Sequence, residues 1–312
     1  MIEGQEGVSW DQWVALAETC ERAGIESLFR SDHYLSGNFP HERTAHDAWT
    51  TLAGLAARTS TLRLGTLVSP VTFRHPSLLA NAAATVDHIS GGRVEVGMGA
   101  GWMEHEHRAF GFPFPPLRER VAMLAEQIEI VHRQWTEEHV DFEGAHYTLV
   151  DCPALPKPVQ HPHPPLLVGG RAQPGTLTPA VRFADEYNLL GSSIEDYAKA
   201  RRTLDEACER AGRDPKTLRL SVMTGFALAG DRADLLERAR RTMERWGADV
   251  SPEDALARYE ARGTAGTPEQ FLEGLARLEE AGVERIMLQH ALHDDLETVE
   301  LLGREVVPHT AA

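Results

Sequence analysis

Short apolar runs alternate with longer amphipathic segments along almost the whole chain, and this alternation constrains the fold more than any other feature. A run such as Leu62–Val68 has the length and apolar character of a buried strand. The segment after it, Pro76–His88, carries a proline where the first turn of a helix accepts one. Strands that alternate with helices form βαβ units, whose strands lie parallel in one sheet. The expected strands are Ile25–Arg30, Leu62–Val68, Arg93–Gly99, Pro165–Gly170, Glu186–Gly191, Leu218–Leu228 and Glu284–Leu288.

A strand at the extreme N-terminus, Met1–Glu3, brings the count to about eight. Eight βα units in 312 residues favour an α/β TIM (β/α)8 barrel over a doubly wound sheet, so we expect one barrel domain over residues 1–312. A barrel strand usually needs about five residues. The first strand is therefore expected to be truncated, with the natural start upstream. Insertions are expected at Trp102–Pro116 and at a hairpin around Glu143 and Gly144.

Composition excludes several classes of partner. The net charge of −16 argues against nucleic acid and anionic membrane surfaces as general partners. No apolar run approaches the roughly 18 residues of a transmembrane helix, and the first residues do not have the form of a secretory signal. Cys20, Cys152 and Cys208 show neither pairing nor metal-ligand spacing. This pattern predicts a cytoplasmic protein.

Polar residues and glycines follow successive strands, where a barrel places its active site. Glycines let backbone amides approach a ligand closely. We expect Arg74, His75 and Arg171 to add positive charge beside helix starts, which already favour anions. The residues that follow the strands include Glu3, Asp32, His33, Ser69, Thr72, Gly99, Ala100, Gly101, Gly169, Gly170, Arg171 and Asn188.

Each of these signals also has an ordinary explanation. Asp32 and His33 could simply cap a turn, and parallel strands often end in glycine. The run Met103–Arg108 contains two histidines and two glutamates, which suggests a metal site. Alternating charge is more typical of a solvated helix face, and no further ligands are spaced to complete a site, so no metal is expected. The repetition of the pattern after five successive strands is the stronger signal.

Several segments resemble, in order, one known superfamily. They contain the motifs Arg74-His75-Pro76, D-x-I-S-G-G-R from Asp87 and G-x-G-A-G-W ending at Trp102. The segments are Ser27–Leu35, Leu62–Trp102, Phe110–Trp135, Pro156–Gly170 and Arg182–Leu190. The chain resembles the bacterial luciferase-like superfamily of flavin- and deazaflavin-dependent oxidoreductases. Within it, the chain is most similar to the coenzyme F420-dependent branch.

The resemblance implies a role for the loop after the third strand. In such enzymes a non-prolyl cis peptide bulges from that strand and supports the central ring of the cofactor from behind. This sequence would place it at Leu67–Val68, or one bond later at Val68–Ser69. Leu67 departs from the small or polar residue that the family commonly has there, which leaves the choice of bond open.

The resemblance also implies roles for the other loops. His33, preceded by Asp32, matches a histidine implicated in proton transfer beside the reactive ring. Gly99, Ala100 and Gly101 would line the ring and the tail, and Thr72 would donate to the polar edge of the ring. Gly169, Gly170 and Arg171 match the segment that holds the cofactor phosphate. Some relatives carry a glutamate where this chain has Trp102, which puts sugar-phosphate dehydrogenase chemistry in doubt.

The function that the resemblance implies is hydride transfer between the C5 carbon of coenzyme F420 and an unidentified small organic substrate, with His33 as the proton partner. Glu3 and Trp102 are candidates for the substrate side, and Trp102–Pro116 for a lid. One alternative is an FMN-dependent monooxygenase that uses reduced flavin and O2. A second is a non-catalytic flavin- or deazaflavin-binding protein. Relatives usually pair, so we expect a homodimer.

Overall fold

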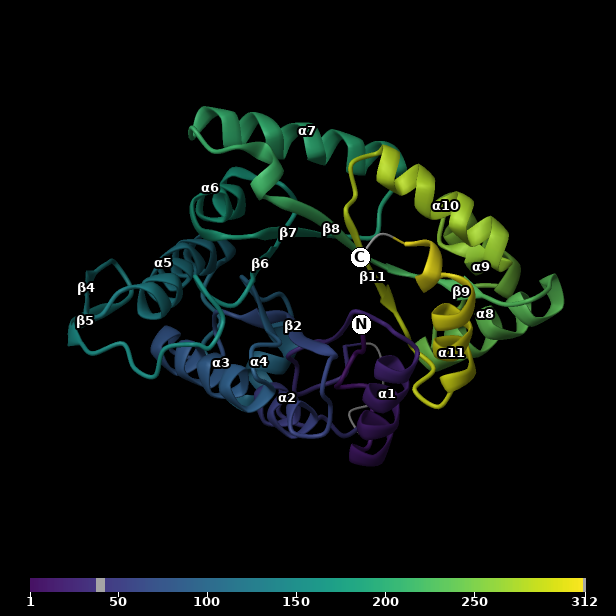
Figure 1. The fold of residues 1–312 in the computed structure, drawn as a ribbon, viewed down its shortest axis with the longest axis horizontal. Coiled ribbons are helices and arrows are strands. Elements are labelled where there is room, and N and C mark those ends of the chain that lie inside the picture. Colours follow the sequence, from purple (N-terminus) through teal and green to yellow (C-terminus); the bar gives the residue numbers. More distant parts are fainter. Residues whose placement is uncertain (38–42, 311–312) are drawn as a thin grey trace.

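The computed structural model describes residues 1–37 and 43–310 and contains seven parallel strands joined in one sheet. These strands are β1 Ser27–Arg30, β2 Arg63–Pro70, β3 Val94–Gly99, β6 Leu166–Gly169, β7 Glu186–Leu190, β8 Arg219–Gly225 and β11 Arg285–Gln289. They follow one another around the sheet in chain order, as successive βα units do, and the sheet curves into a barrel with helices on its outside (Figure 1). The predicted TIM barrel is confirmed.

The helix predicted over Pro76–His88 is found as α3, which begins at Pro76 as expected. Ser9 caps the first helix in a reciprocal capping box with Gln12. The helices are α1 Trp10–Arg22, α2 Ala48–Ala56, α3 Pro76–Ser90, α4 Glu104–Phe110, α5 Leu117–Thr136, α6 Pro174–Phe183, α7 Ile194–Arg210, α8 Arg232–Trp246, α9 Pro252–Ala261, α10 Pro268–Glu280 and α11 Leu296–Glu305. None of the helices in the described part of the chain is long and apolar enough to cross a membrane.

The N-terminal segment occupies the position of the eighth strand. Ile2 forms a parallel bridge with Arg30 at the end of β1. On the other side, the amino group of Met1 donates to the carbonyl of Leu288 at 2.9 Å, and the amide of His290 donates to the carbonyl of Met1 at 2.9 Å. The short first strand expected at Met1–Glu3 therefore lies between β11 and β1 and joins the two edges of the sheet.

The structure corrects one strand and adds one helix. The predicted strand Leu218–Leu228 breaks after Gly225: β9 Ala227–Leu228 leaves the barrel and pairs with β10 Ala265–Gly266. The insertion after β3 contains α4, which was not predicted because its run of histidines and glutamates has no apolar stripe. The predicted hairpin is confirmed as the antiparallel pair β4 Val140–Glu143 and β5 Thr148–Cys152.

A buried ion cluster lies at the N-terminal ends of the barrel strands and was not predicted. The guanidinium Nη1 of Arg285 lies 2.6 Å from Glu95 Oε2 and 3.2 Å from Glu186 Oε2. Burial raises the pKa of Glu186, and the charge of Arg285 does not fully offset it. For Glu95, burial is outweighed by hydrogen bonds and charge from Arg285 and Arg63, so its pKa is lowered. Arg285 thus bridges two buried carboxylates at the opposite end from the candidate site, and Arg63 pairs with one of them, Glu95, at 2.5 Å.

Candidate active site

Predicted site residues from four neighbouring strands meet at the C-terminal end of the barrel. The hydroxyl of Ser69 on β2 donates to Asp32 Oδ2, after β1, at 2.8 Å. The side chain of Val68, also on β2, faces Gly99 on β3 and Gly169 on β6. Because these strands are parallel neighbours in the order β1, β2, β3 and β6, their ends share one edge of the sheet.

Val68 lies at a bulge in β2. The Leu67–Val68 peptide bond is cis, which confirms the first of the two predicted positions, and the pairing of β2 with β3 shifts register between Thr66 and Ser69. A Cβ atom added at Gly99 would lie 2.5 Å from Val68 Cγ2, and one added at Gly169 would lie 3.1 Å from Val68 Cγ1. The two strand-end glycines therefore leave the space that this side chain fills.

Asp32 is buried and only half satisfied. Its Oδ2 accepts from Ser69 and pairs with Arg74, whereas its Oδ1 is buried without any hydrogen-bond partner among the described residues. Arg74 also pairs with Asp47 Oδ2 at 2.7 Å and donates to the hydroxyl of Tyr34 at 3.0 Å. A buried oxygen without a partner is costly unless something donates to it, so Oδ1 is a place where a ligand donor fits.

We expected Arg74, His75 and Arg171 to add positive charge for an anion beside helix starts. This expectation is wrong for Arg74 and His75. Arg74 lies between the carboxylates of Asp32 and Asp47, which neutralise it. His75 is exposed, accepts the amide of Ser77 through Nδ1 at 3.2 Å and contacts Tyr147 edge-on. Both side chains stabilise the loop and the start of α3. The positive charge of Arg74 is therefore paired within the protein.

His33 is held by a carboxylate that the sequence did not reveal. Its Nδ1 lies 2.8 Å from Glu106 Oε2 on α4, and its ring meets that of Trp102 edge-on, with centroids 5.7 Å apart. Burial alone would lower the pKa of His33. The hydrogen bond and charge of Glu106, with the charges of Glu3 and Asp32, outweigh burial, so the pKa of His33 is raised.

The hydroxyl of Thr72 has a protein partner. Its Oγ1 lies 2.6 Å from Nε2 of the buried His107, whose Nδ1 lies 2.7 Å from the carbonyl of Met103. The hydroxyl that we expected to donate to the cofactor ring is therefore already hydrogen-bonded to His107. Through Glu106 and His107, α4 is anchored to the barrel mouth.

The turn between β6 and α6 is organised by Tyr187. Its hydroxyl accepts the amide of Ala172 at 2.9 Å and lies 2.6 Å from Thr176 Oγ1. A Cβ atom at Gly170 would lie 2.1 Å from this hydroxyl, which explains the glycine. The exposed Arg171 belongs to this turn, and no side chain caps the first turn of α6. Pro174 has no amide hydrogen, and the amides of Thr176 and Leu177 donate to the carbonyl of Gln173, so the charge of Arg171 is the feature of this turn that suits an anion.

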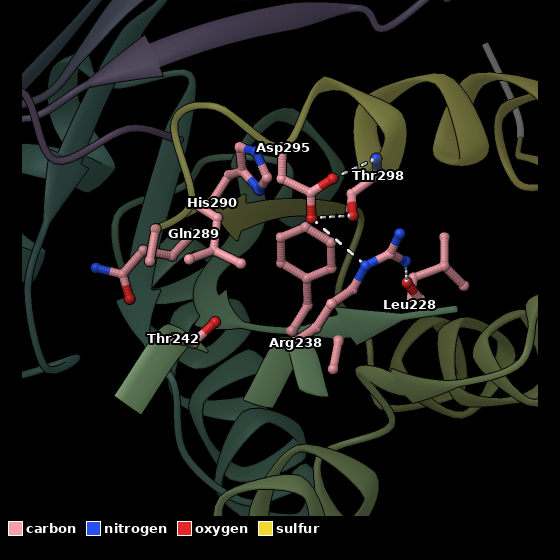
Figure 2. A pocket seen from close by; sticks show the side chains of 11 residues that line it. Leu228, Arg238, Thr242, Gln289, His290, Asp295 and Thr298 are labelled. Carbon is pink, nitrogen blue, oxygen red and sulfur yellow. Dashed lines mark hydrogen bonds and ion pairs between the residues drawn. The ribbon is translucent and has the colours of Figure 1, made fainter. Parts of the chain in front are cut away.

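A small cavity lies beyond the C-terminal ends of β8 and β11 and has a volume of about 20 Å³, enough for one water. TIM barrels often bind phosphate after these last two strands. Here the carboxylate of Asp295 caps α11, bonding the amide and hydroxyl of Thr298, and Arg238 points at it (Figure 2). Burial lowers the pKa of His290 to about 4, so its ring is neutral. The cavity is therefore no anion site.

Two further residues lie at the barrel mouth. Glu3 is buried and accepts from the side chains of Gln5 at 2.9 Å and Gln289 at 2.7 Å. Trp102 remains 66% exposed beside His33. Both were expected on the substrate side, and their positions suit it. Glu106 was missed because its charge-rich run reads as solvated, and only its contact with His33 distinguishes it.

Comparison with known proteins agrees with this geometry. Residues 2–285 match the family described as luciferase-like monooxygenase. The chain is 28% identical to an FMNH2-dependent dimethylsulfone monooxygenase of Pseudomonas putida, over 97% of this chain and 89% of that protein. It is 28% identical to an F420-dependent glucose-6-phosphate dehydrogenase of Amycolatopsis mediterranei, over 96% of this chain and 94% of that protein. The crystal structure of monooxygenase RslO1 from Streptomyces bottropensis superposes with a TM-score of 0.82 at 27% identity, covering 97% of this chain and 94% of that chain.

Proposed function

The chain belongs to the luciferase-like monooxygenase family, and from that premise we propose that it is a coenzyme F420-dependent oxidoreductase acting on a small organic substrate. Its relatives are F420- or FMN-dependent oxidoreductases and monooxygenases, so it is an enzyme whose cofactor is one of these two. The choice of F420 and of hydride transfer is the proposal. It is supported by similarity to F420-dependent dehydrogenases over 96% of the chain.

The residues at the barrel mouth fit a planar ring with an anionic tail. Val68, which lies in the space left by Gly99 and Gly169, would support the ring, and the unpartnered Asp32 Oδ1 would accept from its polar edge. The turn at Arg171 would hold the phosphate. When bound, the reduced deazaflavin supplies a hydride from C5. The residues of the chain then orient the ring, exclude water and transfer one proton to or from the substrate.

The observation that carries the proposal is the ionisable His33 fixed by Glu106 at this mouth. Hydride transfer to a polarised double bond needs one proton partner, and a histidine positioned through one ring nitrogen supplies it from the other. The second candidate, an FMN-dependent monooxygenase, is favoured by the 28% identity with an FMNH2-dependent enzyme over 97% of the chain.

Titration of the purified protein with F420 and with FMN tests the proposal. We expect F420 to bind at least about tenfold more tightly than FMN, a difference of about 1.4 kcal/mol, with quenching of cofactor fluorescence as the measurement. Tighter binding of FMN, followed by O2 consumption when the flavin is reduced, would replace the proposal with the second candidate. Binding of neither cofactor would contradict both.

Replacing Arg171 with alanine is expected to weaken F420 binding about tenfold at low salt and to flatten its salt dependence, because a screened charge–phosphate contact is lost. Arg182→Ala is the matched control: Arg182 lies in the last turn of α6, the helix that follows Arg171, is 60% exposed and pairs with Glu129. Equal affinities for the Arg171 variant and the control would show that the phosphate binds elsewhere.

We propose further that the enzyme is a cytoplasmic homodimer of one-domain chains spanning residues 1–312, with a small molecule as its partner. The net charge of −16 supports the absence of nucleic-acid and membrane partners. The described cysteines are all unpaired, which suits a reducing compartment. Measurement of the mass in solution by light scattering tests the dimer.

A further inference from the structure

Glu106 is a fully buried carboxylate whose two oxygens have different partners. Its Oε2 lies 2.8 Å from His33 Nδ1. Its Oε1 accepts from the backbone amides of Tyr34 and Leu35, the latter at 3.0 Å. Hydrogen bonds from backbone amides favour the charged form of a carboxylate. A single side chain on α4 therefore fixes both the backbone after His33 and one nitrogen of its ring.

The contact with Glu106 determines what His33 can do. A carboxylate only accepts, so Nδ1 is the donor in this hydrogen bond. The other ring nitrogen, Nε2, has no hydrogen-bond partner in the part of the chain that the structure describes. The side chain of His33 is 11% exposed. Nε2 is thus the nitrogen left for a substrate.

The charged groups that face His33 are all acidic. Glu106 comes from α4, Glu3 from the N-terminal segment and Asp32 from the loop of His33 itself. Burial opposes the imidazolium, but the acidic groups outweigh it and raise the pKa of His33. The ring of Trp102 covers one side of the imidazole without adding charge. Arg74, the nearby cation, is paired with Asp32 and Asp47.

We propose that Glu106 is a positioning residue that fixes His33 through Nδ1, so that the ring exchanges a proton with the substrate at Nε2 and gives it when an electron-poor C=C, C=N or C=O bond is reduced. This inference rests on the proposed function. It names the side chain that orients the proton partner. A carboxylate that accepts from one ring nitrogen leaves the other nitrogen to give a proton in this direction and to accept one in the reverse direction.

The atoms and electrons of the step balance. The substrate takes up a hydride, two electrons and one proton, from the reduced cofactor at one end of its double bond. It takes up a proton from His33 Nε2 at the other end. The substrate is reduced by two electrons and the cofactor is oxidised by the same two. The neutral imidazole keeps its Nδ1–H bond to Glu106 and regains a proton at Nε2 from water, and the ring proton that the cofactor would lose on oxidation returns to water and closes the balance.

Nuclear magnetic resonance of the ring nitrogens in the full chain without cofactor tests the proposal. We expect His33 in the wild-type protein to titrate above its ordinary value of 6.5 and to be protonated on both nitrogens below that pH. In Glu106→Gln the amide still accepts from the backbone but cannot carry the charge. The pKa of His33 should then fall by at least about one pH unit.

The controls keep the result specific. Glu104→Gln changes an exposed residue at the start of the same helix and should leave the titration of His33 unchanged. Glu106→Asp keeps the charge and should restore part of the shift. A wild-type His33 that is already neutral at pH 6.5, or a folded Glu106→Gln variant with an unchanged titration, would overturn the proposal. The wild-type titration decides even if the variant does not fold.

The same experiment separates this inference from the proposed function. Failure to bind F420 would remove the proposed function and leave the titration of His33 as measured. Tight F420 binding together with a neutral His33 would retain the cofactor and remove the donor role. In a loaded enzyme with reduced F420, donation by His33 predicts that turnover falls as the pH rises through the pKa of His33. In Glu106→Gln this fall in turnover should occur at lower pH.

Discussion

Replacing His33 with asparagine is expected to lower turnover by about two to four orders of magnitude while changing the dissociation constant of the cofactor only a few-fold. The amide of asparagine can still donate toward Glu106 from near the position of Nδ1. It has no atom in the place of Nε2 and no ionisable proton. The substitution therefore removes proton transfer and leaves the loop largely intact.

The measurement separates binding from chemistry. Cofactor affinity comes from fluorescence titration, and the chemical step from single-turnover oxidation of reduced F420. Trp102→Phe is a suitable comparison, because it retains an aromatic ring beside His33 without touching its proton. An equal loss of affinity and turnover in His33→Asn would show that the histidine is only a binding residue.

Replacing Arg285 with methionine is expected to lower the free energy of unfolding by about 3 kcal/mol, because it removes a buried cation that pairs with two buried carboxylates. Glu95 then retains Arg63, at 2.5 Å, and Glu186 retains Arg219, at 3.7 Å. Glu95 and Glu186 are each 2% exposed. The exposed pair Arg210 and Glu206 gives the control: Arg210→Met should cost no more than about 0.5 kcal/mol. Urea unfolding at pH 7 measures both variants. Equal stabilities would show that the cluster is better solvated than its burial indicates.

The effect of Arg285→Met should depend on pH. The lowered pKa of Glu95 in the folded protein contributes stability above its ordinary value of 4.5, which is lost as pH falls through the folded pKa. Without Arg285 this contribution becomes smaller, because Arg63 alone remains beside Glu95, and the more weakly paired Glu186 gains stability by taking up a proton. The difference between the wild type and the variant should therefore shrink as the pH is lowered toward 4.5.

Local patterns were enough to predict the barrel, and residues expected after successive strands do lie together at one end of it. Strand lengths and the residues that follow each strand depend on only a few neighbouring positions of the chain. The resemblance to the superfamily located the Leu67–Val68 bond. The roles of the cofactor-binding residues remain predictions.

The pairings that define the charges of the site could not be predicted, because they join distant segments. His33 and Glu106 are 73 residues apart, and Arg285 and Glu95 are 190 apart. In the sequence each of these charges is compatible with a solvated surface. Arg74 was expected to serve a ligand for the same reason: its two carboxylate partners lie on other segments.

The Asp295 carboxylate at the start of α11 has a consequence for selectivity. A phosphorylated metabolite that entered beyond β8 and β11 would compete with an anion that is part of the chain itself and is bonded to Thr298 and Arg238. The Asp295 carboxylate is covalently part of the chain, so it occupies this position permanently. A phosphate beyond β8 and β11 would therefore meet a carboxylate that already engages the groups able to bind it.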